Sequence, residues 1–396
     1  MKTQPKNEAA STAPGEEDFG GKDRVKQLIS ELSSHFIGRE EEARIAVLSL
    51  VTRNHCVFIG EPGTAKSALL RKLSEAVGGR YYYYLLSRYT IPDELIGPID
   101  PVEYKNGNFK RLLANRLPQA NIAFIDEVFK ASSETLNTLL NIMNERSFVD
   151  VDGTVYSVPL ISMFAASNEL PRGDELQAFY DRILIKHFVR PIDPTKLKDG
   201  ILLNLQNGGN GKLTSTITMD ELTLIYNEIW NYMTTHNEAV ADVISQLIVV
   251  MRQHGIFVSD RTAMNPTYFP MIVSAYSYIY DTDLKKSAIT MSKYILQDDD
   301  EQLAAYSKAL DSLYPPELRA AQEQLEKAKE AAAGGDLKTA KEQGLQAIQQ
   351  LQGVADKPEA MELYKSEISE LMGDAENLVM QINRMQEQLK SMKVRA

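Results

Sequence analysis

Short, continuous apolar runs alternate with helix-like segments over the first half of the chain. Four runs have the length and apolar character of buried strands: residues 56–59, 81–86, 122–125 and 158–166. The segments at 22–36 and 40–52 instead repeat apolar residues at helical spacing. Strands that are apolar throughout and alternate with helices favour a parallel sheet with covered faces. We therefore expect an α/β domain built on a parallel sheet.

After residue 191 the pattern becomes wholly helical. Apolar residues recur at helical spacing over residues 219–236, 238–254, 265–280 and 284–313, and a glycine-rich loop at 207–211 precedes them. The acidic residues 298–301 lack the glycine and the spacing of a calcium loop, so they favour a helix start. This region predicts a second, all-helical domain.

A third region follows Pro315-Pro316, where Ala, Glu, Gln, Lys and Leu dominate. Between positions 361 and 392 the apolar residues fall at intervals of three and four, an a/d seam of more than four heptads. Residues 318–332 and 337–351 repeat the pattern between glycine-containing turns. Two shorter helices folded against a long one would form an antiparallel bundle. The alternative is a long helix that pairs with another chain.

Two turn-rich segments interrupt the α/β pattern. Residues 92–118 contain the hairpin signal KNGN at 105–108, and residues 148–156 turn at Asp-Gly. Each segment predicts an inserted β-hairpin. Lys105, Lys110 and Arg111 could contact a polyanion, but charges on a solvated hairpin are the commoner meaning of such residues.

Composition and charge narrow the class of protein. The chain has 396 residues, 43% of them hydrophobic, and its formal net charge of −11 disfavours nucleic acid as the main ligand. A single cysteine, Cys56, excludes an internal disulfide framework, and the five histidines lack metal-ligand spacing. Every apolar run is shorter than a membrane span. Residues 1–21 are polar without a signal core and predict a disordered tail, so we expect a cytoplasmic protein.

The strand at 56–59 leads into the stretch GEPGTAKS at 60–67, and a helical pattern follows. Strand, glycine-rich turn and helix are the context of a phosphate-binding loop, whose backbone N–H groups and helix N-terminus surround phosphates. Lys66 would reach the β- and γ-phosphates, and the Ser67 hydroxyl would hold Mg²⁺. The other residues that we assign to the nucleotide here are Gly60, Glu61, Pro62, Gly63, Thr64, Ala65 and Ala68.

Ala65 stands where such loops carry a second glycine. Alanine is compatible with right-handed helical angles, so we expect the loop to close. It would fail only if position 65 needed a positive φ. By itself the motif could also be an ordinary glycine-containing turn before a helix.

Polar residues follow two of the predicted strands. Asp126 and Glu127 end the strand at 122–125, and Asn168 follows the strand at 158–166. Ligands bind at the carboxyl edge of parallel strands, so Asp126 is placed for the Mg²⁺ shell and Glu127 for the attacking water. Asn168 can bond the γ-phosphate or that water. A surface turn after a core strand is the alternative for the two carboxylates.

Two arginines are candidates to complete the site. Arg182 precedes an apolar stretch and could act as an arginine finger, a fixed cation that stabilises the transferring phosphoryl group. A salt bridge with Asp181 or another acid explains it equally well. Arg261 opens a segment of the helical region and could swing onto the nucleotide from that domain.

In order and spacing, GEPGTAKS, AFIDEVFKAS, AASNELP and AFYDRILIK resemble the motifs of AAA+ ATPases. In detail they resemble those of the MoxR family, and they are most similar to those of its RavA branch. The resemblance covers about residues 22–313. It implies an αβα nucleotide-binding domain at 22–192, an all-α lid at 193–314 and a triple-helix domain at 315–396. It further implies a hexameric ring that uses ATP and Mg²⁺, with segments 92–118 and 148–156 similar to the family's helix-2 and pre-sensor-1 inserts.

The resemblance also implies roles for single residues. Lys66 and Ser67 resemble the Walker A pair, Asp126 and Glu127 the Walker B pair, Asn168 sensor 1, Arg182 an arginine finger that reaches the neighbouring subunit, and Arg261 sensor 2 on the lid. We also place Ile37, in the turn at 37–39, at the nucleotide.

Three functions fit these features. The first is a ring-forming ATPase that remodels or matures protein complexes, with a von Willebrand factor A domain protein as the partner that MoxR-like ATPases commonly use. The second is a nucleic-acid translocase, which shares the inserts but needs a basic pore and salt-sensitive binding. The third is a nucleotide-gated scaffold with negligible turnover.

Overall fold

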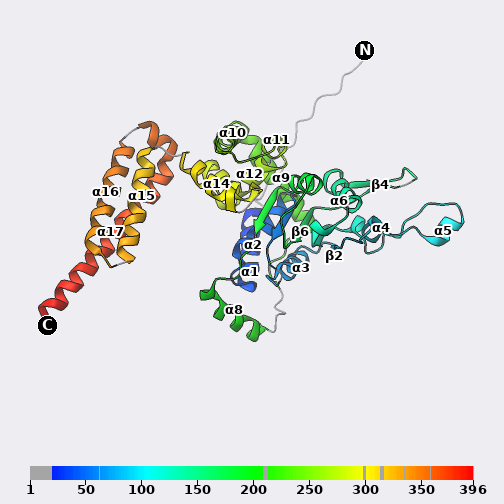
Figure 1. The fold of residues 1–396 in the computed structure, drawn as a ribbon, viewed down its shortest axis with the longest axis horizontal. Helices are drawn as coiled ribbons and strands as arrows, with labels where there is room; N and C mark the ends of the chain where they lie inside the picture. Colours follow the sequence, from blue (N-terminus) through cyan, green and yellow to red (C-terminus); the bar gives the residue numbers. More distant parts are fainter. Residues whose placement is uncertain are drawn as a thin grey trace, which may run out of the picture. The chain divides into compact units, whose positions relative to one another are not determined.

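The computed structural model describes residues 20–61, 63–150, 152–207, 213–297, 300–312, 316–333, 335–356 and 358–395 (Figure 1). The predicted tail at 1–21 lies almost wholly outside these residues, as do Pro62 and most of the loop at 207–211. The chain divides into two compact units: the described residues of Met1–Val249 and Phe257–Gln302, and those of Val250–Ile256 and Leu303–Ala396. None of the described helices combines the length and apolar character that a membrane crossing requires.

Five parallel strands form the sheet of the first unit, in the order β2-β3-β6-β1-β7. They are β1 (Cys56–Ile59), β2 (Tyr81–Leu85), β3 (Ile122–Asp126), β6 (Ser162–Ser167) and β7 (Ile185–Phe188). β1, β3 and β6 lie inside the sheet and are buried almost throughout, whereas β2 lies at one edge. The expected parallel α/β core is confirmed, although the strand predicted at 158–166 begins only at Ser162.

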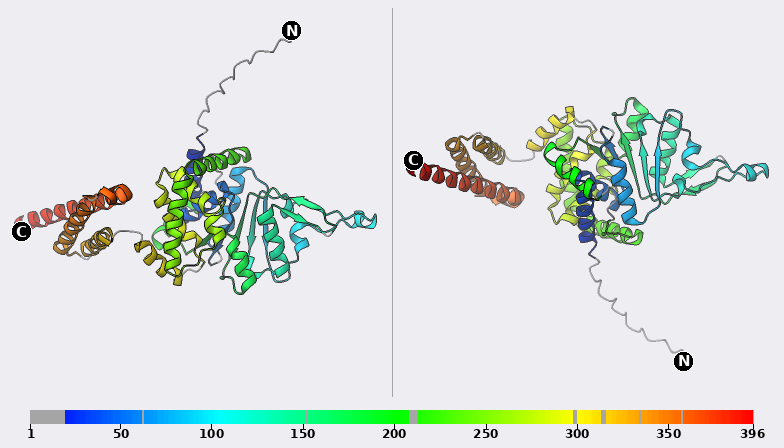
Figure 2. Two further views of the ribbon diagram at one scale, coloured as in Figure 1. Left: turned by 90° about the horizontal axis from the view of Figure 1, so that it is seen from above. Right: turned by 90° about the horizontal axis from the view of Figure 1, so that it is seen from below.

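Helices cover both faces of this sheet (Figures 1 and 2). The covering helices are α1 (Gly21–His35), α2 (Glu40–Val51), α3 (Lys66–Val77), α6 (Ser133–Glu145) and α7 (Asp174–Arg182). Val57 and Ile125 share a buried core with Leu139 of α6 and Phe179 of α7. Because successive strand residues point to opposite faces, Phe58 faces the other layer, formed by α2 and α3. These layers match the predicted αβα arrangement.

The first insert folds differently from its prediction. Residues 92–118 form two short helices, α4 (Pro92–Ile96) and α5 (Pro101–Lys105), and a single antiparallel bridge joins Ile99 to Arg111. The predicted hairpin is wrong because Asp100 caps α5, accepting hydrogen bonds from the N–H groups of Val102 and Glu103. The second insert is the predicted hairpin, β4 (Ser147–Val149) with β5 (Val155–Ser157).

Arg111 ties the two inserts together. Its Nε donates to Asp150 Oδ2 at 2.8 Å, just after β4, and its Nη1 donates to Asp93 Oδ1 at 2.7 Å in α4. The Arg111 and Asp150 side chains are only 6% and 2% exposed. The expectation that Arg111 is a solvated hairpin charge is therefore wrong. The insert projects from the sheet in each view (Figures 1 and 2).

The region after residue 191 is helical, as predicted. Its elements are α8 (Pro194–Asn207), α9 (Met219–Thr235), α10 (Asn237–Gln253), α11 (Asp260–Met264), α12 (Phe269–Tyr280), α13 (Leu284–Ser292) and the 3-10 turn η3 (Lys293–Ile295). The helix expected from residue 265 begins only at Phe269. Helices α9 and α12 pack on each other and on α1 and α2. The predicted boundary at 192/193 between core and lid stays a prediction.

The second unit contains most of α14 (Asp300–Ser312), whose predicted acidic start is described only from residue 300, and three longer helices. These are α15 (Pro316–Ala333), α16 (Leu337–Ala355) and α17 (Pro358–Arg395). Leu325 of α15, Ala347 of α16 and Ala375 of α17 form part of their shared core. A Cβ on Gly344 would lie 2.8 Å from Val379 Cγ2, so a small residue allows this close packing. Two shorter helices thus fold against a long one.

Candidate functional site

The loop at 60–67 joins the carboxyl end of β1 to the first turn of α3. Gly60 is required by close packing, because a Cβ there would lie 2.3 Å from the Val189 carbonyl oxygen. Thr64 Oγ1 donates to the Glu61 carbonyl at 3.0 Å, a hydrogen bond within the loop. Strand, loop and helix therefore adopt the order that the sequence predicts for a phosphate-binding loop.

Ala65 adopts a left-handed conformation, with φ 62° and ψ 12°, directly before α3. The expectation that position 65 takes right-handed helical angles is wrong. A non-glycine residue in this region costs about 1–2 kcal/mol, because its Cβ approaches the following carbonyl oxygen. The loop nevertheless closes, so the alanine carries backbone strain where the usual motif has a glycine.

Lys66 lies in the loop and contacts the loop's own carbonyls. Its Nζ donates to the carbonyl oxygens of Gly60 at 2.9 Å and Glu61 at 3.3 Å. Burial lowers the pKa of the Lys66 ammonium, against the opposing charges of Asp126 and Glu127. The lysine therefore lies within electrostatic range of both carboxylates, as its predicted role requires.

Glu127 and Asn168 meet at the carboxyl edge of the sheet because β3 and β6 are neighbouring parallel strands. Asn168 Nδ2 donates to Glu127 Oε1 at 2.9 Å. Glu127 adopts a left-handed backbone with φ 56°, and its N–H donates to Asp126 Oδ1 at 3.0 Å. Lys130 Nζ lies 3.2 Å from Glu127 Oε2, a contact that the sequence analysis missed. Its signal was the spacing of three residues within FIDEVFK.

The donors present fit a magnesium ion. The Ser67 hydroxyl begins α3 and the Asp126 carboxylate ends β3, and Mg²⁺ prefers such hard oxygen donors. Within the described part of the chain, no three His, Cys, Asp or Glu side chains gather in a way that could hold a metal ion.

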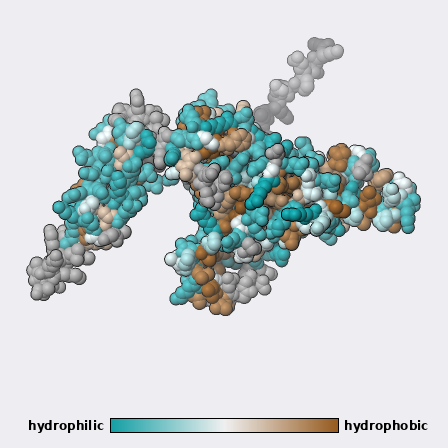
Figure 3. Space-filling view, in the orientation of Figure 1, coloured by the Kyte–Doolittle hydropathy of each residue, from teal (hydrophilic) through white to brown (hydrophobic). Residues whose placement is uncertain are grey.

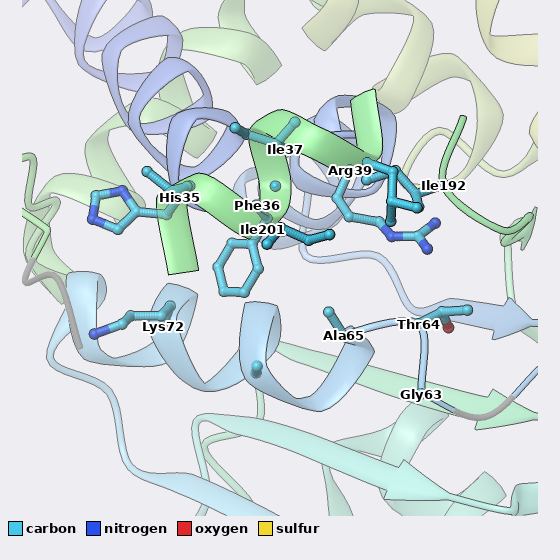
Figure 4. A pocket seen from close by; sticks show the side chains of 14 residues that line it. His35, Phe36, Ile37, Arg39, Gly63, Thr64, Ala65, Lys72, Ile192 and Ile201 are labelled. Carbon is cyan, nitrogen blue, oxygen red and sulfur yellow. The ribbon is translucent and has the colours of Figure 1, made fainter. Parts of the chain in front are cut away.

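A cavity of about 470 Å³ adjoins the loop (Figure 4). Five of the predicted nucleotide residues line it: Ile37, Gly63, Thr64, Ala65 and Ala68. The lining also includes Phe36, Arg39, Ile192 and Ile201 of α8, which the sequence did not indicate. Pockets of this size with mainly apolar walls suit the base of a nucleotide.

Helix α8 forms one wall of this cavity and exposes apolar side chains. Leu197 and Ile201 line the cavity and remain 49% and 51% exposed, and Leu205 is 77% exposed. Figure 3 shows the corresponding apolar patch over α8. Arg39 Nη1 donates to the Arg190 carbonyl at 2.7 Å and so ties the turn at 37–39 to the chain that leads into α8.

Arg182 and Arg261 lie at the opposite edge of the sheet. Cys56 pairs with Ile185 and Ile59 with Phe188, so Arg182 precedes β7 at the amino end, whereas the phosphate loop follows β1 at the carboxyl end. Arg261 Nη1 lies 3.5 Å from Asp181 Oδ2, beside Arg182. The structure therefore does not bring Arg261 onto the nucleotide loop of its own chain, contrary to the expected swing.

In the part of the chain that the structure describes, Arg182 forms no salt bridge with Asp181. Its Nη1 donates to the Ala178 carbonyl at 2.7 Å, within its own helix, while Asp181 pairs with Arg261. Lys66, Glu127 and Asn168 thus lie at the carboxyl ends of the parallel strands, and the two arginines lie at their amino ends. A single chain presents two separate groups of candidate catalytic residues.

Comparison with known proteins gives consistent matches. Residues 23–227, a little over half of the chain, match the family model described as MoxR domain in the MoxR-vWA-beta-propeller ternary systems. An uncharacterized protein of Methanocaldococcus jannaschii is 34% identical over 293 residues, which cover 72% of this chain and 73% of that protein. Protein MoxR of Methylorubrum extorquens is 25% identical over 173 residues, or 42% of this chain and 49% of that protein.

Two more distant proteins extend these matches. Chaperone MoxR1 of Mycobacterium tuberculosis is 23% identical over 135 residues, which cover 34% of this chain and 35% of that protein. The chain therefore spans half or less of the two MoxR proteins. A solved structure from Cytophaga hutchinsonii, described as a candidate ATPase, matches with a TM-score of 0.60 at 20% identity and covers 73% of this chain and 94% of its own. At that identity it supports the fold alone.

Proposed function

The chain belongs to the MoxR family of AAA+ ATPases, and we propose that it hydrolyses ATP at the contacts between copies in a hexameric ring, to remodel or mature protein complexes. The observation that carries this proposal is the separation of the two residue groups by the sheet. Lys66, Glu127 and Asn168 serve one nucleotide. Arg182 and Arg261 would bind the nucleotide of an adjoining copy, because they lie at the amino ends of the strands, away from the phosphate loop of their own chain.

Each group has a defined task in hydrolysis. The cavity beside α8 takes the base, and the loop N–H groups with Lys66 bind the phosphates. Glu127, oriented through Asn168, accepts a proton as a water oxygen attacks the γ-phosphorus and the bond to the β–γ bridging oxygen breaks. Ser67 and Asp126 would hold Mg²⁺, which neutralises developing charge on the phosphates. Arg182 stabilises the same charge from the adjoining copy.

The client is proposed to be a protein complex. Support comes from the family, from the relative named as a chaperone, and from the two inserts joined through Arg111, which project as one unit. The family model is described for MoxR-vWA-beta-propeller systems, so a von Willebrand factor A domain protein is the partner we propose. The three-helix region after Pro316 supports a place in the RavA-like branch. A cytoplasmic location stays a prediction.

The rival functions have less support. A nucleic-acid translocase needs exposed cations on its inserts. Lys105 and Lys110 are exposed there, but Arg111 is buried in ion pairs and the whole chain carries a net charge of −11. A scaffold without turnover leaves the paired Glu127 and Asn168 without a task. We therefore retain the translocase as the alternative and favour the protein-remodelling ATPase.

Replacing the proposed base tests the assignment. Glu127→Gln keeps the shape and the contact with Asn168 but cannot accept a proton, so we expect ATP to bind and turnover to fall by at least about 100-fold. Light scattering with ATP should then show a stable oligomer. Lys66→Ala is the matched variant, which should lose ATP binding. Undiminished hydrolysis by Glu127→Gln would refute the assignment.

A further inference from the structure

A second cavity, of about 510 Å³, opens at the amino edge of the sheet. We call it the arginine cavity. Its lining includes Arg53, Arg146, Arg182 and Arg261, together with Tyr226 and Tyr268. Arg182 and Arg261 were candidates from the sequence, whereas Arg53 and Arg146 were not. Its volume is similar to that of the cavity beside the phosphate loop.

The guanidinium groups converge on shared neighbours. Burial raises the pKa of the Tyr268 phenol, and the charges of Arg261, Arg146 and Arg182 all oppose that rise. Three arginines therefore lie within electrostatic range of one hydroxyl. The Arg53 guanidinium lies 4.4 Å from the centre of the Tyr226 ring. Like charges held this close repel one another unless an anion lies among them.

Arg146 has no carboxylate partner among its contacts in the described chain. Its Nη2 donates to the carbonyl oxygens of Arg53 at 3.1 Å and Ile161 at 3.2 Å. Burial lowers the pKa of the Arg146 guanidinium to about 10, and the nearby Arg53 adds to the effect. A half-buried cation without a carboxylate partner is costly, and an anion that enters the cavity would reduce that cost.

The tautomer of His55 leaves one Arg146 N–H without an acceptor. The Met163 N–H donates to His55 Nδ1 at 2.9 Å, so that nitrogen carries the lone pair. Burial, with Arg146 beside it, lowers the pKa of His55 well below its usual value, so the ring is neutral and its proton lies on Nε2. Nε2 then donates to the Met143 carbonyl at 3.2 Å. Arg146 Nη1, 2.8 Å from Nε2, faces another donor there.

The nearby acids do not balance these charges. Glu145 is the one carboxylate in the lining, and Asp181 is already paired with Arg261. We propose that the arginine cavity is a phosphate-binding site in which Arg53 and Arg146 bind phosphate oxygens together with Arg182 and Arg261. Guanidinium groups match phosphate geometry and bind it bidentately. The ligand class is an oligophosphate, either the triphosphate of a nucleotide held by an adjoining copy or a free oligophosphate.

Only the first of these two sources rests on the proposed function. Binding is tested in the Lys66→Ala background, where the loop of the chain itself no longer holds phosphates. Calorimetry with inorganic tripolyphosphate should show one equivalent bound per chain. Adding Arg146→Gln or Arg53→Gln should weaken binding at least about tenfold, the effect of losing a charged hydrogen bond. Arg384→Gln, on α17, is the matched control and should leave binding unchanged.

Two variants keep this experiment interpretable. Arg146 also bonds two backbone carbonyls, so Arg146→Gln could unfold locally, whereas Arg53→Gln removes a hydrogen bond to the Thr223 side chain and the contact with the Tyr226 ring. Thermal melts should show tripolyphosphate stabilising Lys66→Ala but not the double variant with Arg53→Gln. Absence of tripolyphosphate binding, or binding that neither arginine variant weakens, overturns the proposal. This result is independent of whether the protein hydrolyses ATP.

Mixing variants separates the two sources. Arg146→Gln has an intact loop and a defective arginine cavity, and Lys66→Ala has the reverse. If an adjoining copy supplies the phosphate, a mixture of these two poorly active proteins regains ATPase activity, because some contacts then pair an intact loop with an intact cavity. If the mixture stays inactive while tripolyphosphate still binds to Lys66→Ala, the adjoining copy is overturned as the source and free oligophosphate is the ligand.

Discussion

The Asn168 side-chain amide donates to Glu127 Oε1 at 2.9 Å and so joins the ends of two neighbouring strands. Glu127 adopts a left-handed backbone at this point, and backbone strain of this kind is common where a side chain must be aimed. The amide therefore fixes the direction of the proposed base before any nucleotide arrives.

Asn168→Ala should slow turnover without loss of nucleotide binding. The Glu127 carboxylate would keep its contact with Lys130 but lose the amide that aligns Oε1. We expect kcat to fall by about 10²-fold, the usual contribution of an oriented acid–base group. Steady-state hydrolysis and equilibrium ATP binding, measured on the same preparation, check this. An unchanged kcat would show that the amide does not orient the base.

Ala65→Gly should relax the phosphate loop. Glycine adopts φ 62° without the clash of a Cβ, so the free energy of unfolding should rise by up to about 1 kcal/mol. Ala65→Val adds a branched side chain to the same strained backbone and should abolish ATP binding. Ala76→Gly, at a buried position in the last turn of α3, should instead lower stability by about 1 kcal/mol. Denaturant unfolding and ATP titration distinguish these outcomes.

Removing Asp150 should destabilise the protein far more than removing Asp93. Both carboxylates accept from Arg111, but Asp150 is 2% exposed and Asp93 is 46% exposed. Asp150→Ala leaves a buried guanidinium without that partner and should cost about 3–5 kcal/mol. Asp93→Ala should cost less than about 1 kcal/mol, as an exposed pair does. Equal costs in urea unfolding would contradict a buried tie between the two inserts.

Glu41 makes part of the stability depend on acid pH. Burial by itself would raise the pKa of its carboxyl, but hydrogen bonds from Lys293 and Tyr294 outweigh burial and bring the pKa down to about 2. Because the pKa is lower in the folded state than in the unfolded state, where it is about 4.5, the ionised carboxylate stabilises the fold at pH values above 4.5. This stabilisation is lost as the pH falls from about 4.5 towards 2. The side chain is 37% exposed, so we expect about 1 kcal/mol after screening.

Comparing unfolding of the parent protein and Glu41→Gln across this pH range checks the expectation. Glutamine cannot titrate, so the variant should lose less stability between pH 5 and 2 than the parent. Parallel curves would show that the contact between α2 and η3 does not titrate in this window. Because η3 lies in the predicted lid and α2 in the core, the same contact holds the two predicted domains together.

The parts predicted well are those fixed by local sequence. The strand at 56–59, the loop that follows it and the start of α3 are adjacent in the chain, so their chemistry is visible without tertiary information. Asn168 was placed beside Glu127 because carboxyl ends of parallel strands meet at one edge. The capping of α6 by Ser132, whose hydroxyl accepts a hydrogen bond from the Thr135 N–H, is local in the same way.

The errors arise where distant parts decide the outcome. The φ of Ala65 depends on how the loop must turn between β1 and α3, which residue type alone does not reveal. Arg111 is buried by acids 18 and 39 residues away, so its sequence neighbours could not indicate its environment. Arg261 of α11 lies beside Asp181 of α7, a contact between helices far apart in the chain that helical periodicity cannot show.

Under the proposed function, the parallel direction of the strands determines how many complete catalytic sites an assembly of copies contains. A single chain carries two half-sites, the phosphate-loop residues and the arginines, at opposite ends of the strands. An open row of copies therefore leaves one unpaired half-site at each end. Closing the row into a ring pairs these two and completes one more catalytic site. The ATPase activity per subunit should therefore fall steeply on dilution. One defective subunit that prevents ring closure should lower the ATPase activity of the assembly by more than the activity of one subunit.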